Sequence, residues 1–226
     1  MSPEAIEVDP VTLAADRQVF RDMFDVSRET LARLDVYVEV LLHWQKSMNL
    51  IGPDTQVEVW TRHVLDSAQL AVHVPDEVWA RGRGHVDLGS GAGFPGLVLA
   101  ILSGAPTHLI ERDQRKAAFL REAARLTAAP VTVHAVGAGT LDLPPADVMT
   151  ARALAPLERL LPLAARFADK DTICLFPKGR DVRNELTRAR KAWTIDPDLI
   201  PSITDPEARI VRLKGPSRAR NERSRT

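Results

Sequence analysis

The chain is poor in cysteine and in aromatic residues, and it has no excess of charge of either sign. It has 226 residues and one cysteine, Cys174, which excludes an intramolecular disulfide and fits a reducing, cytoplasmic location. Aromatic residues make up 5% of the sequence, too few to predict a surface on which RNA bases stack. Lys and Arg number 30, as do Asp and Glu, so any contact with nucleic acid must come from local basic patches.

Long apolar runs and metal-ligand patterns are also missing. The longest strictly apolar run beside the glycine-rich stretch covers residues 97–102, far short of the ~20 residues that cross a bilayer. The first ten residues carry acids and prolines instead of a cationic start and an apolar core, which argues against a secretory signal. No metal is predicted, because five histidines show no metal-ligand spacing: His43, His73, His85, His108 and His134.

The first third of the chain has the periodicity of helices. Between residues 10 and 73, apolar side chains recur mostly at spacings of three, four and seven. Ser27 is a predicted helix N-cap, and the Gly-Pro-Asp turn at 52–54 separates this helix from a second helical segment over 55–74. Residues 1–80 are therefore predicted to form an N-terminal helical cap.

From residue 85 the rhythm changes to that of an α/β protein. Short apolar runs alternate with amphipathic segments, which predicts a doubly wound, mostly parallel sheet in a domain over residues 81–215. The last two apolar runs have no helix between them, so the last strand is expected to run antiparallel at or near an edge. The basic segment 216–226 is expected to be a mobile tail.

The stretch 85–99 holds three glycines in five positions directly after an apolar run. Gly89, Gly91 and Gly93 lie at the expected turn from a strand into a helix, where ligands bind in an open α/β sheet. Glycine there lets the backbone approach a ligand and adopt positive φ. Phe94 occupies the position that a dinucleotide-binding fingerprint gives to glycine, which argues against a nicotinamide oxidoreductase.

Two acidic residues flank this loop. Asp87 lies two residues before the first glycine, where a carboxylate suits an ammonium or sulfonium ligand better than a pyrophosphate. Glu111 ends the next apolar run, at the spacing that holds the two hydroxyls of a ribose in this architecture. Acid, glycine-rich loop and acid together favour S-adenosylmethionine as the cofactor. The alternative is an ordinary tight turn from strand to helix.

Several motifs, in their order along the chain, resemble those of the bacterial 16S rRNA guanine-N7 methyltransferases of the glucose-inhibited division protein B family. The loop DLGSGAGFPG is preceded by WQKSMNLIG and RHVLDS and followed by RKAAFLRE, TARAL and FPKG. The resemblance implies a Rossmann-like class I methyltransferase sheet of seven strands with an N-terminal helical cap. It also implies methyl transfer from S-adenosylmethionine to N7 of guanine 527 in 16S rRNA, with the small ribosomal subunit as partner.

The resemblance further implies which residues hold the cofactor: Gly89 and Phe94 in the loop, Ala138 and Gly139 after the third strand, and Arg152 after the fourth. The segment VGAGT departs from the family's usual Arg-Ala-Glu pattern, so the backbone N–H groups of Ala138 and Gly139 are expected to face the adenine. The predicted cofactor residues are thus Asp87, Gly89, Gly91, Gly93, Phe94, Glu111, Ala138, Gly139 and Arg152.

The implied reaction needs little acid–base chemistry. N7 of guanine carries a lone pair and no proton, so the main task is to align N7, the methyl carbon and the sulfur. Arg62 and His63 precede Asp66 by four and three residues and share a helix face with it, either as a cluster over the methyl site or as a surface ion pair. Arg62, His63 and Arg152 are the predicted catalytic residues.

Contacts with the RNA are predicted from basic residues. Lys178 follows the fifth apolar run and either contacts a phosphate or base or is a solvated loop residue. Arg180 opens the segment RDVRNELTRARKAW, whose charges either neutralise phosphates or form a solvated helix face. No amphipathic face is left over, so a monomer is expected. The predicted RNA contacts are Arg62, His63, Lys178 and Arg180.

Two other classes of function remain open. A methyltransferase that acts on a small molecule, a protein or another RNA would share the whole cofactor half. Only the N-terminal cap and the RHVLDS motif argue against it. A non-catalytic RNA- or ribosome-binding module would have no use for the bare backbone of Gly89, Gly91 and Gly93 or for the carboxylates of Asp87 and Glu111.

Overall fold

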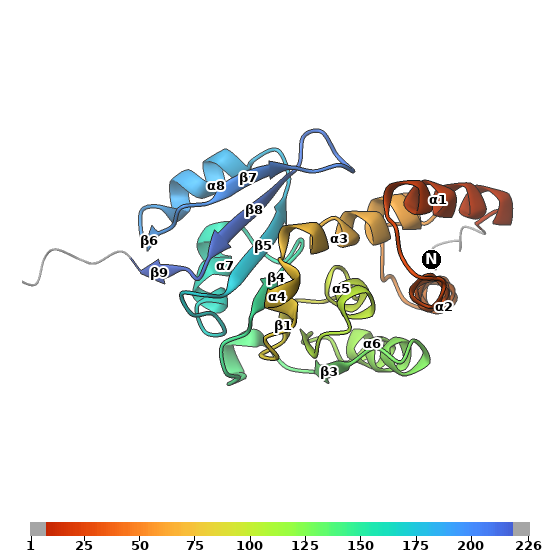
Figure 1. Cartoon of the computed structure of the whole chain (residues 1–226), viewed down its shortest axis with the longest axis horizontal. Helices are drawn as coiled ribbons and strands as arrows, with labels where there is room; N and C mark the ends of the chain where they lie inside the picture. The colour runs from red at the N-terminus through yellow and green to blue at the C-terminus, as the bar shows by residue number, and fades with distance from the viewer. Residues whose placement is uncertain (1–7, 219–226) are drawn as a thin grey trace, which may run out of the picture.

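The computed structural model describes residues 8–218, and its centre is a seven-stranded sheet with the order β3-β2-β1-β4-β5-β8-β7 (Figure 1). The first five strands of that order pair in parallel, whereas β8 runs antiparallel to both of its neighbours. The predicted antiparallel last strand is confirmed, one place from the edge. The strands are β1 (His85–Leu88), β2 (Thr107–Ile110), β3 (Val131–His134), β4 (Val148–Thr150), β5 (Ile173–Lys178), β7 (Asp198–Pro201) and β8 (Arg209–Lys214).

Helices cover both faces of this sheet. Side chains alternate between the faces along each strand, so Leu109 packs in the apolar cluster of α5 and α6 while its neighbour Ile110 packs in the cluster of α7 and α8. Because both faces are covered, the central strands β1 and β4 are buried along their whole length, including the polar side chains of His85 and Asp87. The helices are α5 (Gly96–Ser103), α6 (Gln114–Leu126), α7 (Leu157–Ala164) and α8 (Val182–Ala189).

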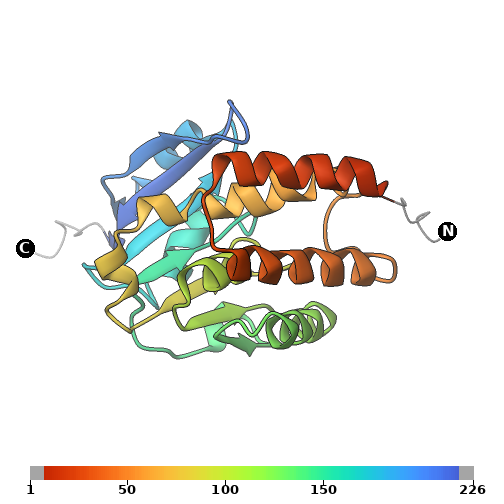
Figure 2. The same cartoon turned by 45° about the vertical axis from the view of Figure 1, so that its right-hand side comes forward.

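Two long helices, α1 (Pro10–Met23) and α2 (Arg28–Gln45), lie side by side at one end of the molecule (Figure 2). The side chain of Ser27 accepts from the backbone N–H of Thr30 at 3.1 Å, which confirms Ser27 as the N-cap of α2. Buried residues of both helices belong to the same apolar cluster as α5 and α6. The cap and the face of the sheet that α5 and α6 cover therefore share one core.

The predicted second helix of the cap, over 55–74, is confirmed over residues 60–68, but it is not regular and does not fill the whole range. A π-helical turn, η2 (Trp60–Leu65), continues directly into a short α-helix. One further short piece precedes η2, and two others follow the α-helix. Asp16 of α1 accepts from the backbone N–H groups of Trp60 and Thr61 at 2.7 and 3.1 Å, so a contact distant in sequence determines how the segment begins. The short pieces are η1 (Pro53–Thr55), α3 (Asp66–Ala68), η3 (Ala71–His73) and α4 (Asp76–Trp79).

A second, two-stranded sheet joins β6 (Trp193–Thr194) to β9 (Ser217–Arg218). The Arg218 guanidinium lies 5.8 Å from the centroid of the Trp193 ring. The first residues of the expected mobile tail are thus held by backbone pairing and a cation–π contact. The rest of that tail, 219–226, lies outside the described residues. Among those described, no helix has the length and apolar content to cross a membrane.

A buried hydroxyl connects the cap to the glycine-rich loop. Tyr37 of α2 is fully buried, and its Oη donates to the carbonyl oxygen of Ala92 at 2.5 Å. Its ring lies 5.3 Å from that of Phe94, and a Cβ on Gly93 would come within 3.0 Å of its Oη. The cap therefore determines how the loop sits over the ends of the strands.

Replacement of this hydroxyl should weaken the fold. In Tyr37→Phe the carbonyl of Ala92 loses its buried donor, and the free energy of unfolding is expected to fall by about 1–3 kcal/mol. Denaturant unfolding followed by circular dichroism measures the change. An unfolding midpoint equal to that of the wild type would contradict the assigned hydrogen bond.

Candidate active site

The loop after β1 presents bare backbone at the carboxyl ends of the strands. Gly89 and Gly91 have φ of 69° and 56°, in the left-handed region that favours glycine. A Cβ on Gly89 would lie 2.6 Å from Cδ1 of Leu154, so a side chain there would have to displace that leucine as well as adopt a left-handed backbone. The N–H of Gly89 donates to the carbonyl of Ile110 at 2.8 Å. This hydrogen bond fixes the start of the loop against β2.

Glu111 follows β2 and is held by this loop. Its Oε2 accepts from the N–H of Gly91 at 2.9 Å, and its Oε1 accepts from the N–H of Asp113 at 2.8 Å. Each carboxylate oxygen keeps a further lone pair. Glu111 is therefore an oriented acceptor beside the bare backbone of the loop.

A cavity of about 610 Å³ opens between the loop, the end of β2, the 3₁₀ turn η4 (Ala138–Thr140) and the segment after β4. Pockets of this size hold small-molecule ligands and cofactors. Leu50, Ile51 and Gly52, in the loop of the cap between α2 and η1, also line it. Most of the predicted cofactor residues line this cavity together: Gly89, Gly91, Phe94, Glu111, Ala138, Gly139 and Arg152, with His63 beside them.

Two predicted cofactor residues lie elsewhere. Asp87 is fully buried behind the loop, and its Oδ1 accepts from Thr150 Oγ1 at 2.6 Å. A Cβ on Gly96 would come within 2.6 Å of Asp87 Oδ2, so this carboxylate lies directly beneath the start of α5. Burial raises the pKa of Asp87 to about 6. Asp87 does not line the cavity, so the prediction that it contacts the sulfonium is corrected. Gly93 does not line the cavity either, because it packs against Tyr37.

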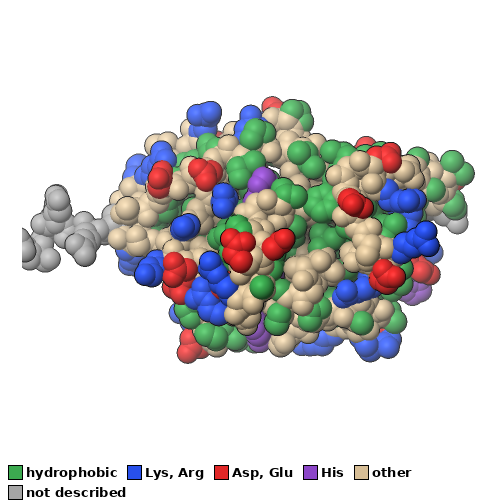
Figure 3. All heavy atoms as spheres, viewed as in Figure 1, with side chains coloured by type: hydrophobic (Ala, Val, Ile, Leu, Met, Phe, Trp, Pro, Cys, Tyr) green, Lys and Arg blue, Asp and Glu red, His purple; other side chains and the backbone are tan. Residues whose placement is uncertain are grey.

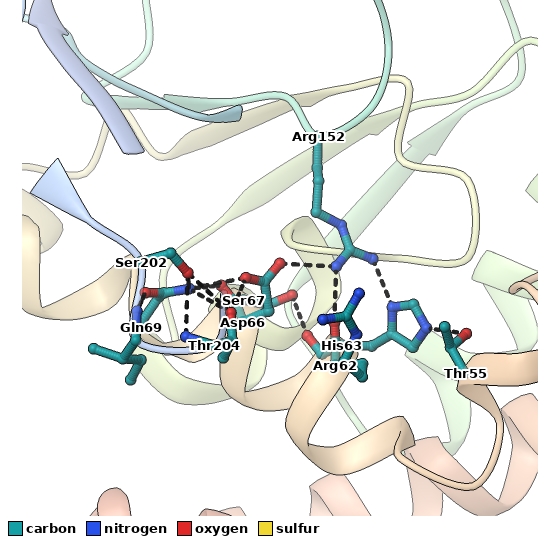
Figure 4. A network of polar contacts seen from close by, with 10 residues as sticks. Thr55, Arg62, His63, Asp66, Ser67, Gln69, Arg152, Ser202 and Thr204 are labelled. Atoms are coloured by element: carbon teal, nitrogen blue, oxygen red, sulfur yellow. Dashed lines mark hydrogen bonds and ion pairs between the residues drawn. The ribbon is translucent and has the colours of Figure 1, made fainter. Parts of the chain in front are cut away.

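Arg152 reaches from the end of β4 to residues 62–66 of the cap, where it meets the other predicted catalytic residues (Figure 4). Its Nη1 lies 3.0 Å from Asp66 Oδ2, and its Nη2 lies 3.0 Å from His63 Nδ1. The guanidinium carbon is 5.0 Å from the centroid of the Phe94 ring, within cation–π range. Arg62 contributes its backbone carbonyl to this group, while its side chain is exposed.

Burial and the neighbouring Arg152 together determine the protonation state of His63. Because a guanidinium can only donate, Nδ1 of His63 accepts, and Nε2–H donates to Thr55 Oγ1 at 2.8 Å. Burial, and then the charges of Arg152 and Arg62, lowers the pKa of His63 to about 3. The imidazole is neutral at physiological pH, with both of its nitrogens engaged.

Asp66 extends the network to the far end of the sheet. Its Oδ1 accepts from Gln69 Nε2 at 2.9 Å and from Thr204 Oγ1 at 2.6 Å, and Thr204 lies in the turn between β7 and β8. The RHVLDS motif contained the signal for Asp66. Three further members carried no local signal, because their roles depend on chain segments brought together by folding: Thr55, Gln69 and Thr204.

A second cavity, of about 750 Å³, lies on the other side of Arg152. The two cavities share four lining residues, His63, Arg152, Ala153 and Leu154. Three of the residues predicted to contact RNA, Arg62, His63 and Lys178, line the second cavity. Arg180 does not; its side chain is 82% exposed and lies 3.8 Å from Glu207.

The described residues contain no cluster of three or more His, Cys, Asp or Glu that could hold a metal ion. The sheet order and the glycine-rich loop beside a cavity define the class: the chain has the fold of class I S-adenosylmethionine-dependent methyltransferases. It is similar to a mutant of MtNAS solved in complex with S-adenosylmethionine, with a TM-score of 0.52 and 16% identity over 95% of this chain and 86% of that one.

The sequence identifies the family within this class. The GidB family model, rRNA small subunit methyltransferase G, matches residues 30–211, and the chain belongs to this family. It is 56% identical over 194 residues to ribosomal RNA small subunit methyltransferase G of Rhodospirillum centenum, which covers 86% of this chain and 88% of the relative. It is 50% identical over 195 residues to the protein of the same name from Paramagnetospirillum magneticum, covering 86% and 93%.

The neutral state of His63 can be tested through stability. A folded-state pKa of about 3, below the usual 6.5, means that its contribution is complete above pH 6.5 and is lost as the pH falls below that value. Between pH 7.5 and pH 5, the wild type should therefore lose about 2 kcal/mol relative to His63→Gln. Urea unfolding of both proteins across this range gives the difference. Parallel stability curves would contradict the assigned protonation state.

Proposed function

We propose that this protein transfers the methyl group of S-adenosylmethionine to N7 of guanine 527 in 16S rRNA. The observation that carries the proposal is the pair of cavities that meet at Arg152, His63 and Leu154. One cavity has the bare backbone and the acid that suit a nucleoside cofactor, and the other is open to a base. Membership of the family and the names of its relatives support ribosomal RNA as the substrate.

The residues of the first cavity fit the cofactor. Glu111 is placed to accept from the ribose hydroxyls, and the backbone of Gly89 and Gly91 leaves room beside it. The N–H groups of Ala138 and Gly139 are proposed to face the adenine, in the turn η4. When bound, S-adenosylmethionine supplies an electrophilic methyl group on a sulfonium.

The residues of the wall that the two cavities share, among them Arg152 and His63, position the base and do not deprotonate it. N7 of guanine already carries the attacking lone pair, so no general base is required. His63 fits this role, because its Nδ1 is engaged by Arg152 and its Nε2–H by Thr55. Arg152 and His63 thus form a fixed surface against which the target base can be aligned, and alignment is a large part of catalysis for such a reaction.

The base becomes cationic as N7 accepts the methyl group, and a bare cation nearby would oppose this step. Arg152 carries such a charge, but Asp66 lies 3.0 Å from it. The ion pair keeps the donors of Arg152 in the site and offsets most of its field at the base. Asp66 is a positioning residue in this scheme.

The exposed Arg62 and Arg180 are proposed to contact phosphates of the RNA. On the face in Figure 3, basic and acidic side chains are interspersed, which suits local phosphate contacts more than long-range attraction. Phosphate contacts make binding weaker as salt rises. We also propose that the protein acts as a monomer in the cytoplasm, where its single thiol, Cys174, remains reduced inside the sheet.

The reaction can be tested with a labelled methyl donor and two forms of the substrate, naked 16S rRNA and small ribosomal subunits. Incorporation into 16S rRNA is expected, with the product mapped to guanine 527 by strand cleavage at N7-methylguanine. Label in another RNA, in a ribosomal protein or in a small molecule would favour the rival methyltransferases. Binding of subunits without any incorporation would favour a non-catalytic module.

The cofactor assignment has its own test. Glu111→Gln should weaken binding of S-adenosylmethionine by about 10- to 100-fold, because hydrogen bonds to a charged group contribute about 1.5–3 kcal/mol. Titration calorimetry measures the affinity. Glu122→Gln is the matched control, since Glu122 pairs with Arg125 on the exposed face of α6. Equal affinities for the two variants would refute the role of Glu111.

A further inference from the structure

Lys178 and Glu185 form an ion pair inside the second cavity. Lys178 is therefore neither a solvated loop residue nor an unpaired charge that is free to bind a phosphate. Lys178 ends β5 and Glu185 lies on α8, and both side chains line the cavity. Nζ lies 3.0 Å from Glu185 Oε2, and the two side chains are only 9% and 15% exposed. A buried ion pair adds little to stability when compared with apolar packing. This one is therefore a candidate for a role in binding.

The pair has one donor and one acceptor left for a ligand. Lys178 Nζ donates to the carbonyl of Ala155 at 2.5 Å and faces Glu185, which leaves one of its three N–H groups. Glu185 Oε2 also accepts from the N–H of Leu157 at 2.8 Å, whereas the hydrogen bonds of the described residues do not use Oε1. Two other acids line this cavity. Asp66 has both oxygens engaged, and Asp205 forms no ion pair with a cation among the described residues, so Glu185 is the acid that combines a free oxygen with a neighbouring lysine donor.

We propose that Lys178 and Glu185 read the Watson–Crick edge of the target guanine, an inference that rests on the proposed function. On that edge guanine offers the acceptor O6 beside the donor N1–H, and the pair offers the matching donor beside an acceptor. Adenine presents the reverse order, an amino donor beside the acceptor N1, and would face Lys178 with a donor. Enzymes that modify a flipped-out base commonly read it through hydrogen bonds to this edge.

The same contact assists the chemistry. When N7 takes the methyl group, the ring becomes positively charged and N1–H becomes a stronger donor. The hydrogen bond to Glu185 Oε1 therefore strengthens in the transition state, and an interaction of that kind raises the rate of the chemical step. Glu185 would thus contribute both to the choice of base and to the rate.

The experiment compares small subunits reconstituted from 16S rRNA that carries either guanine or 2,6-diaminopurine at the target position. Both bases have N7, but diaminopurine has the adenine-like order of donor and acceptor. The wild type is expected to prefer guanine by at least 100-fold in kcat/KM. In Glu185→Gln an amide N–H can face N1, so this preference should fall by tenfold or more, and Lys178→Met should lower it similarly.

Controls separate this role from a structural one. Glu158→Gln is the matched variant, because Glu158 pairs with Arg188 and lines neither cavity; its preference should equal that of the wild type. Affinity for S-adenosylmethionine and the melting temperature are measured for every variant. If Glu185→Gln and Lys178→Met slow the methylation of both bases equally, the proposed reading is overturned. If the wild type modifies neither substrate, the proposed function itself fails.

Discussion

The ion pair between Arg152 and Asp66 is the contact on which the geometry of the site depends. Nη1 and Oδ2 lie 3.0 Å apart and come from residues 86 positions apart in the chain, with side chains 20% and 17% exposed. Loss of either partner would leave the other as a largely buried, uncompensated charge. The pair therefore holds residues 60–68 of the cap against the ends of the strands, and its guanidinium forms part of the wall that the two cavities share.

The shape of the cap segment follows from the same requirement. A π-helical turn over Trp60–Leu65 leads directly into Asp66, so that His63 and Asp66 both meet the guanidinium of Arg152. π-Helical turns are rare in proteins, and those that occur are often found at functional sites. Asp16 binds the first N–H groups of this turn from α1. The first helix of the chain thus helps to position a side chain at the wall without touching either cavity.

Features decided by neighbours in the chain could be predicted from the sequence. The order of apolar and amphipathic segments indicated the sheet, and the glycines at 89 and 91 indicated where the first cavity opens. Features decided by packing could not. The sequence places Asp87 at the end of a strand. Its burial between Thr150 and the start of α5 could not be predicted, because these contacts form only when the chain folds. Likewise, the charges around Glu185 resemble a solvated helix face until α8 packs on the sheet.

The distribution of carboxylates matches the movement of charge in the proposed reaction. Before transfer the positive charge belongs to the cofactor, in the cavity that Glu111 lines; afterwards it belongs to the base, beside Asp66 and Glu185. Of the three acids that line the second cavity, Asp66 and Glu185 are each paired with a cation, Arg152 and Lys178 respectively. Paired charges give directed donors and acceptors without a large net field. Such a site can accommodate the cationic cofactor in one cavity before transfer and the cationic base in the other after it. The transition state can then be stabilised without tight binding of the methylated product.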